Sequence, residues 1–342
     1  MNKILEVKDL RTYFFTNTGT VKAVNGVSFF VCKGETFGIV GESGCGKSQT
    51  CRAILSLIKK PGKIVGGEIL YKGQDIIKMS QDELRRIRGK EMSIIFQEPM
   101  TSLNPVLTIK KQMFEAFSQT NMTKQEKLQR SIELLRLVGI PSPENRINEY
   151  VHQFSGGMRQ RAMIAVALCS QPELLIADEP TTALDVTIQD QIIKLLAKLK
   201  QELNMSIILV THDLGVVAQM CDRVAVMYAG IIVELTDTTT LFSKPRHPYS
   251  YALMGSLPDQ SKIGSDLEVI SGSPPNLVDM PSGCPFAPRC KYAIDICLKK
   301  LPELVAIEKG HLTRCHRLEI VSKFPGIIAD TTTKKSRGDI DA

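Results

Sequence analysis

The chain has 342 residues, room for about two domains, and its 43% share of hydrophobic residues is ordinary for a globular protein. No hydrophobic run approaches the roughly 18–20 residues that cross a bilayer, and the charged start does not resemble a signal peptide. The net charge of +7 is scattered, without an aromatic-rich basic patch, so nucleic-acid binding is not indicated. We therefore expect a cytoplasmic protein that reaches a membrane only through partner subunits.

The first part of the chain is predicted to contain strands that lead into a phosphate-binding loop. Residues 4–9 and 27–32 are predicted strands, and the turn-like stretch 16–19 lies between them. The hydrophobic stretch 36–40 predicts another strand, and residues 41–48 follow it with the sequence G-E-S-G-C-G-K-S. This segment matches G-x-x-x-x-G-K-[ST], and a helix-compatible run follows, as the motif requires.

The chemistry of residues 41–48, the phosphate loop, is that of a nucleoside triphosphate site. Its glycines let successive backbone N–H groups point into one hollow, and the helix N-terminus behind them adds partial positive charge. Lys47 can reach the β- and γ-phosphates, and the Ser48 hydroxyl can bind Mg²⁺. The residues predicted to contact the nucleotide here are Gly41, Ser43, Gly44, Cys45, Gly46, Lys47, Ser48 and Gln49.

The middle of the chain is predicted to be mostly helical. A short strand is predicted at 93–96, and residues 106–164 then have mainly helical character. Thr123 and Glu126 have the spacing of a capping box at the start of one helix. The segment Ser155-Gly156-Gly157 precedes another predicted helix. The N-terminus of that helix is a second candidate anion site.

A parallel sheet is predicted to resume after this helical region. The hydrophobic runs at 174–177 and 207–210 lack alternation, as is typical of strands that are covered on both faces. A helix at about 187–203 between them completes a β-α-β unit, and residues 224–234 predict a hairpin around Gly230.

An acidic pair closes the run at 174–177. Asp178 would hold Mg²⁺, directly or through water, and Glu179 would orient the attacking water or accept its proton. Phosphoryl transfer needs mainly positioning and charge neutralisation, so one carboxylate for the metal and one for the water are sufficient. A solvated acidic pair at a strand end is the alternative interpretation, and the phosphate loop earlier in the chain disfavours it.

The order of these motifs resembles that of an ATP-binding-cassette (ABC) ATPase over about residues 3–245. Walker A is at 41–48, the Q-loop at Gln97, the signature sequence at 154–158, Walker B at 174–179, the D-loop at 182–185 and the H-loop at 211–213. Phe154 and Met158 differ from the commoner Leu and Gln of the signature, but neither change alters the Ser-Gly-Gly contact with an anion.

The resemblance implies a head-to-tail dimer in which ATP lies between Walker A of one chain and the signature sequence of the other. Ser155, Gly156, Gly157 and, from the D-loop, Asp185 would then contact nucleotide held by the partner. His212 would contact the γ-phosphate and stabilise its charge.

Two further assignments complete the expected site. The resemblance places Gln97 both at the Mg²⁺ and among the catalytic groups, with Glu179, His212 and Lys47. It also implies an aromatic residue upstream of Walker A that stacks on adenine, for which Phe14 is our choice and Tyr13 the alternative.

Within the ABC family, three segments resemble ATPase subunits of dipeptide and oligopeptide importers: residues 96–105, 153–161 and 246–249. Importers of nickel and other solutes share much of this pattern, so that alternative stays open. The resemblance implies a peripheral protein at the cytoplasmic face of the membrane. Its implied partners are a second ABC ATPase, either a sister chain or a second copy, two transmembrane permease subunits and, indirectly, an extracytoplasmic peptide-binding protein.

Four of the nine cysteines lie near the C-terminus with the spacing Cys284-x5-Cys290-x6-Cys297-x17-Cys315. None forms the close C-x₂₋₄-C pair that is usual in structural zinc sites. Iron–sulfur clusters are commonly held by four cysteines, and the peptide-importer ATPases that this chain resembles can carry a [4Fe–4S] cluster in this region. We expect a [4Fe–4S] cluster, with zinc or plain thiols as the alternatives.

These observations predict an α/β fold: a P-loop core of ABC-ATPase type with an antiparallel β subdomain and an inserted helical subdomain at about 98–163. The nucleotide-binding domain is expected at 1–245, a small cysteine-rich C-terminal extension at 246–328 and a flexible tail at 329–342. A soluble, non-transport ABC protein is a competing hypothesis, but the chain has a single Walker A and no large insertion. An iron–sulfur protein with a vestigial nucleotide site is another, and the intact Lys47, Glu179 and His212 argue against it.

Overall fold

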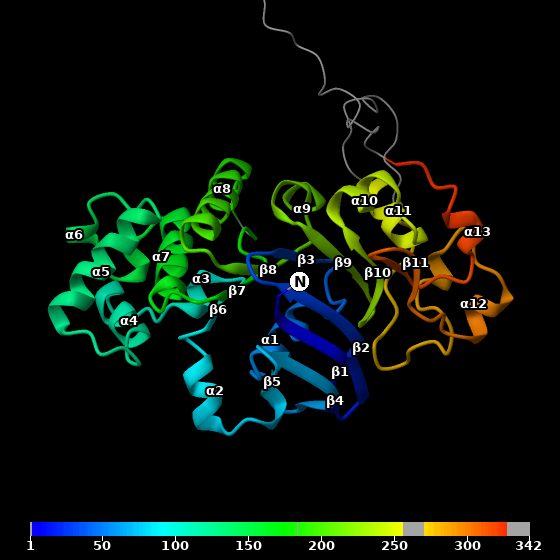
Figure 1. Cartoon of the computed structure of the whole chain (residues 1–342), viewed down its shortest axis with the longest axis horizontal. Helices are drawn as coiled ribbons and strands as arrows, with labels where there is room; N and C mark the ends of the chain where they lie inside the picture. The colour runs from blue at the N-terminus through cyan, green and yellow to red at the C-terminus, as the bar shows by residue number, and fades with distance from the viewer. Residues whose placement is uncertain (1, 183, 256–269, 327–342) are drawn as a thin grey trace, which may run out of the picture.

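A large mixed sheet runs through the centre of the protein (Figure 1). The computed structural model describes residues 2–182, 184–255 and 270–326, so the tail predicted at 329–342 lies outside the described residues. Within them, the strand order of the large sheet is β11 (Val305–Glu308), β12 (His311–Thr313), β10 (Ile231–Asp237), β9 (Arg223–Tyr228), β3 (Thr36–Val40), β8 (Ser206–Thr211), β7 (Leu174–Asp178) and β6 (Met92–Ile95).

The strands β9, β3, β8, β7 and β6 are parallel, as the unbroken hydrophobic runs predict. Alternate residues of one strand belong to different cores: Leu175 and Ala177 lie in a cluster with helices α8 and α9, whereas Leu174 and Ile176 lie in a cluster with α1 and the smaller sheet. Both faces are therefore covered, and the few polar residues of these strands lie at or next to the strand ends. Because parallel strands end at one edge, the loops after β3, β6, β7 and β8 meet there.

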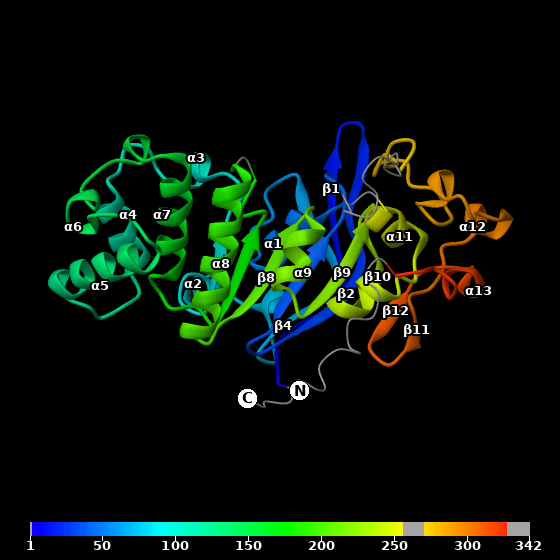
Figure 2. The ribbon, with the colours of Figure 1, turned by 90° about the horizontal axis from the view of Figure 1, so that it is seen from above.

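A second sheet of antiparallel strands packs beside the first (Figure 2). Its order is β2 (Gly19–Cys32), β1 (Lys3–Thr16), β4 (Gly62–Tyr71) and β5 (Gln74–Asp75). The predicted strands at 4–9 and 27–32 are confirmed but extend up to the tight turn at 16–19, so they form one long hairpin. Strand β4 was not predicted, because its lysine and three glycines weaken the strand pattern.

The helices lie around the two sheets and in a separate lobe (Figure 1). Their bounds are α1 (Lys47–Ile54), α2 (Gln81–Ile87), α3 (Pro99–Ser102), α4 (Ile109–Ala116), α5 (Lys124–Leu137), α6 (Pro143–Arg146), α7 (Gly156–Leu168), α8 (Val186–Glu202), α9 (Leu214–Met220), α10 (Thr238–Ser243), α11 (Pro248–Gly255), α12 (Asp295–Lys299) and α13 (Leu318–Val321). Across the described ranges, no helix combines the length and the hydrophobicity that a membrane crossing requires.

The helices α4, α5, α6 and α7 form the helical lobe, at the left of Figure 1. The predicted capping box at the start of α5 is confirmed, because the Thr123 hydroxyl accepts a hydrogen bond from the Glu126 amide and the Glu126 carboxylate accepts one from the Thr123 amide. Leu134, Leu135 and neighbouring hydrophobic residues are fully buried between α4, α5 and α7. The lobe therefore has a core of its own that continues into the core of the large sheet.

The C-terminal segment is attached to the large sheet. We predicted a small irregular module here, but β12 pairs antiparallel with β10, and β11 pairs with β12. An open edge at β10 would leave backbone donors and acceptors unpaired, and β12 satisfies them. At the centre of this junction, His311 Nε2 lies 2.8 Å from Glu234 Oε1, and both side chains are buried. The segment is thus rigidly joined to the sheet that positions the phosphate loop.

Candidate nucleotide site

The phosphate loop connects β3 to α1 and depends on glycine at two positions. Gly41 has a φ of +154° and Gly46 a φ of +104°. A Cβ atom would lie 2.1 Å from the Met227 carbonyl oxygen at Gly41 and 2.1 Å from the Ala23 carbonyl oxygen at Gly46. No other residue fits so close to neighbouring backbone. The predicted strand–loop–helix arrangement is confirmed.

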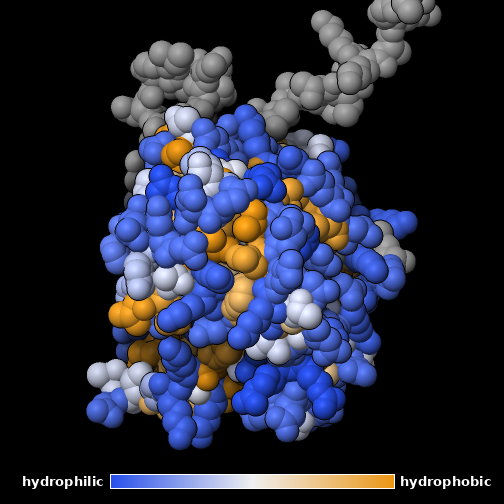
Figure 3. Space-filling view, turned by 90° about the vertical axis from the view of Figure 1, so that its left-hand side faces the viewer, coloured by the Kyte–Doolittle hydropathy of each residue, from blue (hydrophilic) through white to orange (hydrophobic). Residues whose placement is uncertain are grey.

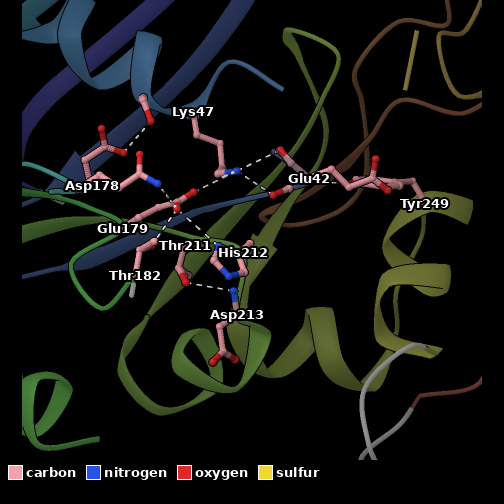
Figure 4. A network of polar contacts seen from close by, with 12 residues as sticks. Glu42, Lys47, Asp178, Glu179, Thr182, Thr211, His212, Asp213 and Tyr249 are labelled. Atoms are coloured by element: carbon pink, nitrogen blue, oxygen red, sulfur yellow. Dashed lines mark hydrogen bonds and ion pairs between the residues drawn. The ribbon is translucent and has the colours of Figure 1, made fainter. Parts of the chain in front are cut away.

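Lys47 lies inside this loop, with only 4% of its side chain exposed. Its Nζ donates hydrogen bonds to the carbonyl oxygens of Gly41, at 2.8 Å, and Glu42, at 3.0 Å. The same nitrogen is 3.7 Å from Glu179 Oε1 (Figure 4). The ammonium group is therefore held between the loop backbone and the end of β7, where it can meet an anionic phosphate.

Ser48 and Asp178 form the second contact between α1 and β7. The Ser48 hydroxyl donates to Asp178 Oδ1 at 2.8 Å, and Asp178 is almost fully buried. Burial raises the pKa of Asp178, although the Ser48 hydrogen bond opposes this shift. A hydroxyl and a carboxylate side by side form the hard oxygen donor set that Mg²⁺ prefers, so these residues fit the predicted metal.

Glu179 follows β7 and is the centre of a polar network (Figure 4). Its Oε2 accepts hydrogen bonds from Gln97 Nε2 at 3.0 Å and from the Thr182 hydroxyl at 3.0 Å. Its φ of +48° turns the chain at the strand end, and its amide donates to the Val210 carbonyl oxygen of β8. Residues after β6 and β7 are therefore brought together as the parallel sheet predicts.

His212 follows β8 and completes this group. Its Nδ1 is 3.6 Å from Glu179 Oε2, and 63% of the side chain is exposed. The neighbouring residues hold the loop, because the Thr211 hydroxyl accepts a hydrogen bond from the Asp213 amide, and the Asp213 carboxylate caps α9. The imidazole is thus at the surface of the site, where it can approach a bound group.

The two aromatic candidates for adenine stacking have different surroundings. The Tyr13 hydroxyl donates to Asn25 Oδ1 at 2.7 Å, on the paired strand β2. Phe14 lies along a groove of about 740 Å³ that Gln49, Phe96 and Gln97 also line. Tyr13 is therefore hydrogen-bonded to the neighbouring strand, whereas Phe14 lines the groove.

The signature and D-loop residues lie at the starts of other helices. The Ser155 hydroxyl accepts a hydrogen bond from the Met158 amide and caps α7, which continues from Gly156 and Gly157. Asp185 caps α8 in the same way, with its Oδ1 2.9 Å from the Ile188 amide nitrogen. In the described parts of the chain, no hydrogen bond or ion pair joins these residues to Lys47.

Residues of the C-terminal side that were not predicted support the phosphate loop. The Glu42 amide donates to the Tyr249 hydroxyl at 2.9 Å, and the Glu42 carboxylate pairs with Arg289. Glu42 belongs to a variable position of the phosphate-loop motif, and Arg289 lies between two cysteines of the C-terminal segment. The only feature of the sequence that could have singled out Arg289 is its charge within a stretch rich in proline and cysteine.

The four C-terminal cysteines line one cavity, together with His247, Phe286 and His316 among others. Burial raises the pKa of Cys315 to about 12, and the nearby thiols of the other three cysteines add to this shift. Among the residues that the structure describes, however, no three His, Cys, Asp or Glu side chains are placed to hold a single metal ion. This arrangement supports neither the zinc alternative nor the expected [4Fe–4S] cluster.

Two family models match the chain. Residues 24–182 match the model described as "ABC transporter", and residues 233–297 match "Oligopeptide/dipeptide transporter, C-terminal region". The chain is 50% identical to a probable peptide ABC transporter ATP-binding protein of Sinorhizobium fredii, over 92% of this chain and 95% of that protein. It is 49% identical to a dipeptide transport ATP-binding protein of Bacillus subtilis and 48% identical to an oligopeptide transport ATP-binding protein of Salmonella typhimurium. These matches cover 92% of this chain in both cases, and 95% and 94% of those proteins.

Solved structures of ABC cassettes have the same fold. One is the dimeric structure of a bacterial ABC transporter cassette, whose sequence is 28% identical to this chain and which superposes with a TM-score of 0.60. The match covers 67% of this chain and 96% of the cassette. A post-hydrolysis state of that cassette bound to ADP and Pi gives a TM-score of 0.61 at 27% identity, over 68% and 98% of the two chains. The predicted P-loop ABC ATPase fold and the predicted family are confirmed. The chain is an ABC-family ATPase and belongs to the transport ATP-binding proteins that carry the oligopeptide/dipeptide transporter C-terminal region.

Proposed function

We propose that this chain is the ATP-hydrolysing subunit of an ABC importer, which couples the nucleotide cycle to uptake of dipeptides or oligopeptides through partner permease subunits. The observation that carries the proposal is the convergence of Lys47, Asp178 and Glu179 at one sheet edge, in a chain that also has the oligopeptide/dipeptide C-terminal region. The names of the relatives support the peptide substrate.

In the proposed mechanism, each group acts on the triphosphate by position and charge. Lys47 neutralises the β- and γ-phosphates, and Ser48, Asp178 and Gln97 would hold Mg²⁺, which would supply further positive charge at the phosphate oxygens. Glu179, oriented by Gln97 and Thr182, positions the attacking water and takes its proton. His212 approaches the γ-phosphate, and Phe14 stacks on the adenine.

The complete site needs a second cassette. Ser155, Gly156 and Gly157 begin α7, and Asp185 precedes α8, so both sets can face a nucleotide bound by a partner in a head-to-tail dimer. The partner is a sister ATPase or a second copy of this chain. We propose the division into a nucleotide-binding domain at 1–245, with the helical subdomain at about 98–163, and an extension at 246–328.

Contact with two permease subunits is proposed next to the Q-loop. Met100 is 49% exposed and Val106 75% exposed, close in sequence to Gln97. Figure 3 shows hydrophobic residues gathered within an otherwise hydrophilic face of the helical lobe, and such patches commonly mark protein contacts. A permease segment that moves Gln97 would change the support of Glu179 directly. We therefore propose a peripheral position at the cytoplasmic face of the membrane, with an extracytoplasmic peptide-binding protein as an indirect partner.

We also propose that the chain binds a [4Fe–4S] cluster. Its ligands would be Cys284, Cys290, Cys297 and Cys315. All four side chains line one cavity, and the Tyr292 and Arg317 amides each donate a hydrogen bond to a cysteine sulfur, at 3.4 Å. Such N–H···S contacts stabilise thiolate ligands. Four cysteine sulfurs are also the usual ligand set of such a cluster. The cluster would stiffen a segment that is otherwise poor in regular structure.

We expect anaerobically purified protein to contain about four irons and about four acid-labile sulfides per chain. Cys290→Ser should remove most of this iron, whereas Cys32→Ser, which changes a half-buried cysteine outside the cavity, should leave it unchanged. Elemental analysis and sulfide titration measure both. Intact protein without iron, or with about one zinc, would contradict the cluster.

The transport proposal is tested in proteoliposomes that contain this chain, its sister ATPase and the two permease subunits. We expect the ATPase rate to rise at least about fivefold when the binding protein is added with a di- or tripeptide, because closure of the dimer then becomes coupled to substrate delivery. If nickel stimulates the ATPase rate and peptide does not, the transported substrate is nickel and the peptide assignment is wrong. The absence of any substrate-dependent stimulation would contradict a transport role.

A further inference from the structure

A partly buried ion pair joins the C-terminal segment to the phosphate loop. Arg289 Nη1 lies 2.8 Å from Glu42 Oε2, and Arg289 Nη2 lies 3.1 Å from Glu42 Oε1, so the pair is bidentate. The side chain of Arg289 is only 6% exposed and that of Glu42 is 24% exposed. Paired hydrogen bonds of this kind fix direction as well as charge. The link connects positions 247 residues apart in the sequence.

The remaining donors of Arg289 are also used. Its Nε donates to the Ser271 carbonyl oxygen at 3.0 Å, Nη2 to the Ile270 carbonyl oxygen at 3.3 Å and Nη1 to the Tyr228 hydroxyl at 3.2 Å. Burial lowers the pKa of Arg289, but the hydrogen bonds to Glu42 and Tyr228 outweigh it and raise the pKa above its ordinary value. The guanidinium is therefore charged and held in one orientation.

Aromatic rings form the surface behind this pair. Tyr228, Tyr249 and Phe286 pack against one another with ring centroids 4.6 to 5.3 Å apart. Arg289 lies 5.8 Å from the Tyr228 ring centroid, within the range of a cation–π contact. The Tyr249 hydroxyl accepts a hydrogen bond from the Glu42 amide, so the loop residue is held through both its carboxylate and its backbone.

Glu42 in turn contacts the phosphate-binding lysine. Its carbonyl oxygen accepts a hydrogen bond from Lys47 Nζ at 3.0 Å (Figure 4). An unpaired carboxylate in this loop would disfavour a triphosphate bound there, since like charges repel one another in a partly buried site. Arg289 cancels that charge and fixes the backbone that contacts Lys47.

We propose that Arg289 is a positioning residue for ATP binding: it holds Glu42 in place and neutralises its carboxylate beside the triphosphate. The proposal rests on the ATP site described above and assigns part of that site to the C-terminal segment. Since Arg289 directly precedes Cys290, the loop that carries two of the four cysteines also sets the position of this guanidinium.

The test measures binding of a fluorescent ATP analogue to the isolated full-length chain. We expect Arg289→Gln to weaken binding about tenfold, with little change in kcat at saturating ATP, because Glu179 and its partners are untouched. The double variant Glu42→Gln/Arg289→Gln should recover most of the affinity, since both charges are removed together. Arg130→Gln, which breaks a surface pair with Glu133 in the helical lobe, is the matched control and should bind like the wild type.

Two results would overturn the proposal: wild-type affinity in Arg289→Gln, or a double variant that binds no better than Arg289→Gln. A purely structural role would lower the folded fraction without this rescue. If Arg289→Gln does not fold, Arg289→Lys provides the test, because it keeps the charge but not the paired geometry. About threefold weaker binding is then expected, and unchanged binding contradicts the proposal. Failure of the wild type itself to bind ATP would instead refute the ATP site.

Discussion

Glu179→Gln is expected to lower kcat for ATP hydrolysis by about 10²- to 10⁴-fold, the usual contribution of a general base. The change keeps the size of the side chain and an oxygen that can accept hydrogen bonds from Gln97 and Thr182. It removes the negative charge that would take a proton from water. Binding of ATP should stay within about twofold of the wild type or become tighter, because a carboxylate near the phosphates has been neutralised.

Steady-state release of phosphate and equilibrium binding of a fluorescent ATP analogue measure the two quantities separately. Glu173→Gln is the matched control, because Glu173 precedes the same strand, β7, at its opposite end and pairs with Lys72 on the surface. This variant should hydrolyse ATP at the wild-type rate. Hydrolysis by Glu179→Gln at the wild-type rate would show that another group activates the water.

Lys47→Ala is expected to weaken ATP binding about 10- to 100-fold, the effect of losing one or two charge-assisted hydrogen bonds to phosphate. Lys47 is nearly fully buried, so water cannot replace the ammonium group as it would at the surface. The loop should also lose order, because Nζ joins the Gly41 and Glu42 carbonyl oxygens. The same fluorescent analogue measures the change.

The control for this variant is Lys90→Ala, which removes an exposed lysine at the start of the connection to β6. Its affinity for ATP should equal that of the wild type. If Lys47→Ala also bound ATP as tightly as the wild type, the triphosphate would not lie against Lys47. The assignment of the phosphate loop would then be wrong.

The grouping of the residues proposed to bind phosphate could be predicted because each lies in a short motif that follows a predictable strand. Lys47, Asp178, Glu179 and His212 follow strands with unbroken hydrophobic runs, and parallel pairing brings those strand ends to one edge. Local sequence therefore determined most of this part of the site.

Contacts between distant segments could not be predicted in the same way. The pairing of β12 with β10 joins an open sheet edge to a strand of three residues, which has too little pattern to be recognised alone. The bond between Arg289 and Glu42 spans most of the chain, and neither residue belongs to a fixed position of a motif. Both depend on how the C-terminal segment packs, which a single sequence does not specify.

Uptake of a labelled dipeptide by living cells tests the transport role most directly. Cells that lack this chain should fail to accumulate the peptide, and the wild-type chain should restore accumulation whereas Glu179→Gln should not. That result is predicted because uptake depends on the hydrolysis that Glu179 supports. Equal accumulation with the wild type and with Glu179→Gln, or normal accumulation in cells without the chain, would contradict a transport ATPase that drives peptide import.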